Sequence, residues 1–237
     1  MIEYRFNRLM GLSRAIAVLS IGIGLLITAA PAQATVLQAS GWGNVFSTGS
    51  NATCCYNMGF DQGGTRESRD YFKFNLSSIA PGTTIYSAVL SIKEPAYASG
   101  TSSVSFNLGS YGSNISYLTS GNGTDALTAF AALASGTLFA SATDVAANNG
   151  TFVNITLNGA ALAALQSAEG SGTFVIGGYT LGLSGTNNSI FQSSGSQGSV
   201  NLTLDTVPEP ASIVLFGVGL AGLAFKRARK RTGNTGA

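Results

Sequence analysis

The chain has 237 residues with twelve basic side chains, ten acidic ones and no histidine. The lack of histidine excludes Ser-His-Asp triads, Cys-His pairs and histidine-ligated metal sites. Eight of the bases lie in the two terminal segments, so residues 35–206 carry four bases against eight acids and a net charge of −4. Nucleic-acid binding requires clustered Lys and Arg, and we exclude that class because this central region has no such cluster.

The N-terminal segment has the features of an export signal. Three arginines precede an apolar run over 15–30, which is followed by the small-x-small sequence from Ala32 to Ala34. The run is shorter than the roughly 20 residues of a stable membrane span. We predict a helical signal peptide over 1–34 that signal peptidase cleaves after Ala34, and the alternative is an uncleaved N-terminal anchor.

Short segments with two-residue hydrophobic alternation fill residues 35–206. In 71–76, for example, Phe72 and Phe74 share one side, and Tyr71 and Lys73 share the other. About nine such segments with Gly, Ser and Asn turns predict an all-β fold, an antiparallel, jelly-roll-like β-sandwich forming one extracellular domain. The expected strands are 35–39, 71–76, 85–92, 104–108, 137–145, 151–157, 173–179, 189–192 and 200–204.

Two segments have helical rather than strand periodicity. Residues 124–134 begin with the N-cap candidate Thr124, and residues 159–168 place two leucines on one side. Both segments are short, rich in alanine and followed by glycine, which is typical of helix ends. We predict two short helices that cover an end of a sheet.

The two cysteines, Cys54 and Cys55, are adjacent. An exported chain can oxidise its thiols, but neighbouring Cα atoms lie only about 3.8 Å apart, below the usual bridging distance. Three states stay open: free thiols, a vicinal disulfide in a sharp turn, and cross-links to other chains.

Acidic residues gather in one stretch, at Asp61, Glu67 and Asp70, with Arg66 and Arg69 between them. A glycosidase needs two carboxyl groups that flank a bond, so a weak polysaccharide hydrolase using Asp61, Glu67 and Asp70 is the alternative function. An exposed loop of mixed charge explains the same pattern more simply, and we predict that the protein is not an enzyme.

The same stretch contains the one candidate metal site. Asp61 opens the glycine-rich sequence Asp-Gln-Gly-Gly, and such a loop can offer carboxylate and carbonyl oxygens to Ca²⁺. The alternative is an ordinary turn, and we predict no other cofactor.

Aromatic side chains near glycine-rich loops are candidate glycan contacts. Trp42 stands between two glycines, and Tyr56 follows the cysteines. Aromatic faces stack on sugar rings, so both residues are candidates, although Trp42 could instead close one end of the sandwich.

The C-terminal tail combines three features. Pro208, Glu209 and Pro210 form an extended acidic motif, because the two prolines prevent a continuous helix. The uncharged segment 211–225 follows, and five bases within 226–231 end it. These bases favour a cytoplasmic terminus, and fifteen helical residues span only about 22 Å, less than the roughly 30 Å of a bilayer core. We predict a single hydrophobic helix that is a transient or permanent membrane anchor.

This tail, over 207–231, resembles the PEP-CTERM sorting signal of Gram-negative bacteria. The resemblance implies recognition by an exosortase, a membrane protease-transpeptidase, with cleavage near Pro208–Pro210. It also implies an exported protein of the cell surface or extracellular matrix that is associated with exopolysaccharide or biofilm.

The middle domain resembles the DNRLRE-type module over Arg69–Ile92. The shared pattern is an aromatic strand, the sequence Asn-Leu-Ser-Ser-Ile, a turn, and Ile-Tyr-Ser-Ala-Val-Leu. Asn75 stands where that pattern usually has Asp, which puts in doubt any site that needs this carboxylate. The resemblance implies a jelly-roll module related to carbohydrate-binding modules, with extracellular polysaccharide as its partner.

Overall fold

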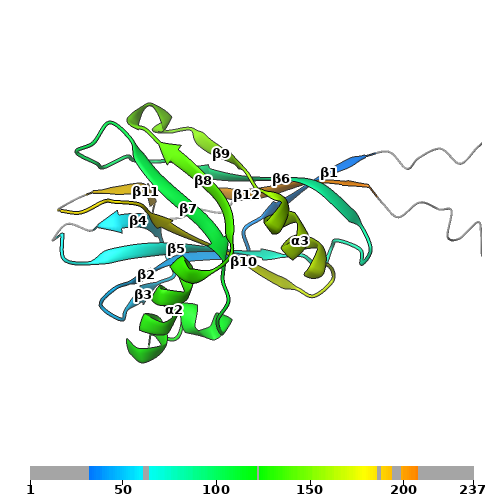
Figure 1. Ribbon diagram of the computed structural model, residues 1–237, viewed down its shortest axis with the longest axis horizontal. Helices are drawn as coiled ribbons and strands as arrows, with labels where there is room; N and C mark the ends of the chain where they lie inside the picture. Colours follow the sequence, from blue (N-terminus) through cyan, green and yellow to red (C-terminus); the bar gives the residue numbers. More distant parts are fainter. Residues whose placement is uncertain (1–31, 61–63, 122, 186–187, 194–198, 208–237) are drawn as a thin grey trace, which may run out of the picture. The chain divides into compact units, whose positions relative to one another are not determined.

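Two antiparallel sheets face each other in the domain (Figure 1). The computed structural model of the protein describes residues 32–60, 64–121, 123–185, 188–193 and 199–207. The first sheet has the strand order β1-β12-β6-β9, and the second has the path β11-β4-β5-β10-β7-β8, with β2 paired to β5 and β3 paired to β2. The first sheet is built from β1 (Gln33–Gln38), β6 (Thr84–Lys93), β9 (Phe152–Thr156) and β12 (Val200–Val207). The second contains β2 (Gly41–Phe46), β3 (Asn51–Ala52), β4 (Tyr56–Phe60), β5 (Glu67–Asn75), β7 (Val104–Ser110), β8 (Leu138–Asp144), β10 (Thr173–Thr180) and β11 (Ser189–Ser193). The predicted antiparallel sandwich with two helices is confirmed.

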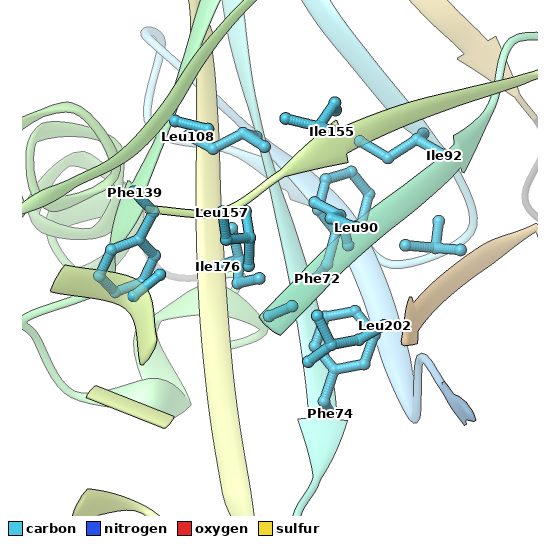
Figure 2. Close-up of a cluster of buried hydrophobic side chains, with 14 of the residues drawn as sticks. Phe72, Phe74, Leu90, Ile92, Leu108, Phe139, Ile155, Leu157, Ile176 and Leu202 are labelled. Carbon is cyan, nitrogen blue, oxygen red and sulfur yellow. The ribbon is translucent and has the colours of Figure 1, made fainter. Parts of the chain in front are cut away.

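The main core fills the space between the sheets, as Figure 2 shows. Alternate residues of the facing strands supply it, among them Phe72 and Phe74 from β5 and Leu90 from β6. Aromatic rings meet edge-on in this layer: the centroids of Tyr56 and Phe72 lie 5.7 Å apart. The period-two pattern in the sequence therefore reports burial against the opposite sheet.

A second core lies on the outer face of the second sheet, under α2 (Gly123–Ser135). Tyr71 and Val45 point to this side of the sheet and meet Ala129 and Leu133 of the helix. The 3-10 helix η1 (Ile115–Leu118) adds a buried leucine. Helix α2 therefore covers a sheet face, whereas the sequence predicted a cover for a sheet end.

The shorter helix α3 (Gly159–Ser167) follows the predicted bounds to within one residue. The side chain of Asn158 accepts hydrogen bonds from the backbone N–H groups of Ala160 and Ala161 and so caps the helix. Ala161 and Leu165 of α3 belong to the main core. A second 3-10 helix, η2 (Ala146–Asn148), links β8 to β9.

Strands β1 and β12 bring the two ends of the domain together. They pair antiparallel, with Gln33 opposite Thr206 and Ala34 opposite Asp205. The predicted cleavage after Ala34 therefore falls inside β1 and would remove its first two residues. The predicted signal helix and the apolar helix at 211–225 lie outside the described residues. Within the described ranges, no helix has the length and apolar character needed to cross a bilayer.

Candidate functional site

A cavity of about 270 Å³ opens where the start of β2 lies beside β5. We call it the β2–β5 pocket. Its described lining consists of Ser40, Gly41, Trp42, Thr53, Tyr71, Lys73 and Thr119. The pocket therefore combines a phenol, an ammonium group and three hydroxyls in a small volume.

Two glycines of β2 make room for the long side chains that line the pocket. Gly41 is opposite Lys73 in the ladder, and Gly43 is opposite Tyr71. A Cβ atom at residue 41 would lie 2.5 Å from Lys73 Cε, and one at residue 43 would lie 2.5 Å from Tyr71 Oη. The absence of side chains at residues 41 and 43 leaves one face of β2 bare for the side chains of Lys73 and Tyr71.

The polar groups of the pocket fit a neutral or anionic polar ligand. The described lining of the pocket contains no carboxylate, and Lys73 is the only charged residue among those lining residues. Burial, reinforced by the nearby Asp70, raises the pKa of Tyr71 to about 12. The phenol therefore keeps its proton at physiological pH and can donate a hydrogen bond.

The two predicted glycan contacts differ in their accessibility. Trp42 lines the pocket, but it is half-buried and packs against the main core, and its buried Nε1 has no hydrogen-bond partner among the described groups. Tyr56 is fully buried, and its hydroxyl donates to the carbonyl oxygen of Lys93 at 3.3 Å. A sugar cannot reach the ring of Tyr56 in this fold, which removes Tyr56 from the candidate contacts.

The charged stretch that we predicted as an exposed loop is largely strand β5. Glu67 forms an ion pair with Arg69 at 3.0 Å, whereas Asp70 is fully buried. Burial raises the pKa of Asp70 well above its usual value, while a hydrogen bond from the N–H of Asn57 at 2.7 Å opposes that rise. Residues three apart in a strand point to opposite faces, so Glu67 and Asp70 do not converge on one substrate. Asp61 lies outside the described residues, so the calcium site predicted near Asp61 falls outside them as well.

A pair of buried acids, which the sequence did not indicate, is formed by Glu94 after β6 and Asp144 at the end of β8. Burial, followed by the contact with Asp144, raises the pKa of Glu94 to about 9. The described ranges contain no group of three or more acidic or cysteine side chains gathered as a metal site.

Cys54 and Cys55 form a vicinal disulfide in the turn between β3 and β4. Of the three states that the sequence left open, the structure has the second. Cys54 is exposed, and the disulfide adjoins Thr53 at the rim of the β2–β5 pocket.

The sorting motif begins where the described domain ends. Strand β12 finishes at Val207, and Pro208, Glu209 and Pro210 lie outside the described residues.

Residues 206–230 match the family model of the PEP-CTERM protein-sorting motif. A search of the curated proteins finds no match. The family match does not include the middle domain, whose likeness to the DNRLRE-type module stays a prediction. The chain therefore carries a PEP-CTERM protein-sorting motif at residues 206–230, which supports its export, its sorting to the cell surface and its processing by an exosortase.

Proposed function

We propose that the domain is a non-enzymatic module of the cell surface or extracellular matrix that associates with exopolysaccharide in a biofilm. The observation that carries this proposal is the sorting motif at 206–230, which directs the chain to the compartment where such polymers accumulate. Signal peptidase, cleaving after Ala34, and an exosortase are its processing partners. The C-terminal helix holds the protein in the membrane transiently or permanently.

The β2–β5 pocket supplies the contact with the polymer in this proposal. Sugar units present many hydroxyls, and Tyr71, Lys73 and the rim hydroxyls offer matching donors and acceptors. The pocket is smaller than the roughly 300–1,000 Å³ of typical drug-sized ligand sites, so it suits one unit of a chain. The opposite orientations of Glu67 and Asp70 support a binding role over hydrolysis.

Filling the pocket from its exposed rim tests the proposal without disturbing the core. Thr53→Trp places a large ring at the pocket mouth, and Ser78→Trp is the matched control because Ser78 is also exposed and is not among the described lining residues. The full chain is run in native gels that contain exopolysaccharide preparations. We expect the wild type and Ser78→Trp to be retarded and Thr53→Trp to migrate freely. Equal retardation of all three proteins would show that the pocket is not the contact.

A further inference from the structure

The outer face of the first sheet carries a row of uncharged polar side chains. Each strand of this sheet packs a leucine or isoleucine against the main core, and Figure 2 labels the last three of them: Leu37, Leu90, Ile155 and Leu202. Side chains alternate between the two faces of a strand, so the residues next to these four point outward. The register places one such residue from each strand side by side, in the order Gln38, Asn201, Ser91 and Asn154. We call these four residues the polar row.

The polar row is open to solvent and is flanked by an aromatic ring. Gln38 and Asn154 at its two ends are exposed, and the two residues between them are half-buried. Ser91 Oγ donates a hydrogen bond to Asn154 Oδ1 at 2.6 Å, so these two side chains hold each other in place. Phe152 points to the same face of β9 as Asn154, two residues away, and is 44% exposed. The β9 end of the row therefore combines fixed hydrogen-bonding groups with an accessible ring.

The spacing of the row suits a repeating polymer. Neighbouring strands lie about 4.8 Å apart, so the row presents hydrogen-bonding groups at that interval. This interval is close to the length of one sugar unit in an extended polysaccharide, so successive sugar units can meet successive strands. The twist of a sheet turns each strand by roughly 20° from the one before it. A single chain with rotatable linkages can follow this twist, whereas a flat crystalline surface cannot.

The charge of this face matches an uncharged partner. No charged residue occurs in the polar row or in the adjacent row, which consists of Val36, Thr203, Val89 and Thr156. The net charge of −4 over residues 35–206 also repels acidic polymers. A second protein molecule fits less well, because the centre of a stable protein interface is apolar. The centre of this face instead contains Ser91, Asn201 and Thr203.

We infer that the polar row binds one chain of a neutral polysaccharide, with Phe152 stacked on a sugar unit at the β9 end. The inference rests on the proposed association with exopolysaccharide, and it adds a contact on a different sheet from the β2–β5 pocket. The amide and hydroxyl groups of the row exchange hydrogen bonds with sugar hydroxyls, and the exposed ring covers the apolar face of a sugar. Each contact alone is weak. The two reinforce each other, because a polymer held at one contact stays near the other.

Native gels of the full chain in mild detergent test the row. The gels contain the neutral fraction of the cell's own exopolysaccharide, from which anion exchange has removed the acidic polymers. Phe152→Ala and Asn154→Ala should each weaken binding about fivefold, the effect of losing one ring contact or one net hydrogen bond. Tyr86→Ala is the matched control, because Tyr86 is a 49% exposed ring on β6 of the same sheet and lies outside the row. This variant should bind like the wild type.

The outcomes separate this inference from the proposed function. Full retardation of both row variants, or retardation of the wild type by the acidic fraction alone, would overturn the inference and leave the proposed function standing. No retardation by either fraction would refute both. Self-association of the wild type that Phe152→Ala abolishes would assign the face to a second copy of the chain and overturn the inference.

Hydrogen–deuterium exchange on the unsubstituted chain keeps the inference testable if a variant fails to fold. The neutral fraction should slow the exchange of backbone amides in β9, at residues 152–156, because the bound polymer covers the outer side of this strand. Protection confined to the strands that line the β2–β5 pocket would overturn the inference.

Discussion

Replacing Asp70 by asparagine is predicted to stabilise the domain at neutral pH. Asp70 Oδ1 accepts the N–H of Asn57 at 2.7 Å, but Oδ2 is buried without a partner among the described groups. Asn44 lies directly opposite in the β2–β5 ladder, and its Oδ1 is also buried and unpartnered in that set. An amide at position 70 keeps the acceptor for Asn57 and offers a donor to Asn44.

The size of the effect follows from the proton that Asp70 must hold. Burial raises the folded-state pKa of Asp70 well above its usual value. The unfolded chain loses this proton near pH 4, while the folded state keeps it, so the free energy of unfolding falls as the pH rises from there to the folded-state pKa. The loss is about 1.4 kcal/mol for each pH unit within this range. The Asp70→Asn variant does not titrate at this position and avoids the loss.

Urea unfolding of the wild type and of Asp70→Asn between pH 4 and pH 8 measures the difference. Titration of Glu94 and of other acids is common to both proteins and cancels in the comparison. We expect similar stabilities near pH 4 and an advantage for the variant that grows with pH. A difference that stays constant with pH, or a less stable variant at pH 7, would mean that Asp70 is ionised in the folded protein.

Three further predictions use the same unfolding assay. Phe72→Ala removes a fully buried ring from the main core and should cost about 3–5 kcal/mol, and a loss below 1 kcal/mol would contradict the packing described. Gly43→Ala should destabilise the domain far more than Gly41→Ala. The new methyl group meets the backbone of β3 at residue 43, but it meets only the flexible side chain of a lysine at residue 41. Equal losses of stability in the two variants would argue against this register. Reduction of the Cys54–Cys55 disulfide should lower stability by no more than about 1 kcal/mol, because the ring that it closes is very short, and global unfolding on reduction would refute this.

Strands with strong alternation were predictable from the sequence, and strands held by their neighbours were not. In β5, β6 and β12, core-facing side chains recur at every second position because each strand packs against the opposite sheet. Strands β2, β3 and β4 are short and contain glycine and asparagine instead, and they were missed. Pairing with β5 or β2 holds them in place, and that pairing leaves no periodic signal in a single segment.

The candidate site was only partly accessible from the sequence for the same reason. The hydrophobic alternation placed Tyr71 and Lys73 on one side of their strand. The pocket, however, exists because β2 pairs with that strand in a register that places a glycine opposite each of these two residues. The contact between Glu94 and Asp144 depends on two sheets closing over each other. Such non-local contacts follow from topology, which local patterns do not encode.

Cell fractionation of the full chain and of a chain that ends at Val207 tests the central claim most directly. Both proteins carry the same N-terminal segment and the same folded domain, and only the full chain has the remainder of the motif matched at 206–230. We predict that the full chain is digested by protease added to intact cells, whereas the shortened chain is exported but missing from the surface. An identical distribution of the two proteins, or recovery of the full chain from the cytosol, would contradict sorting through the PEP-CTERM motif.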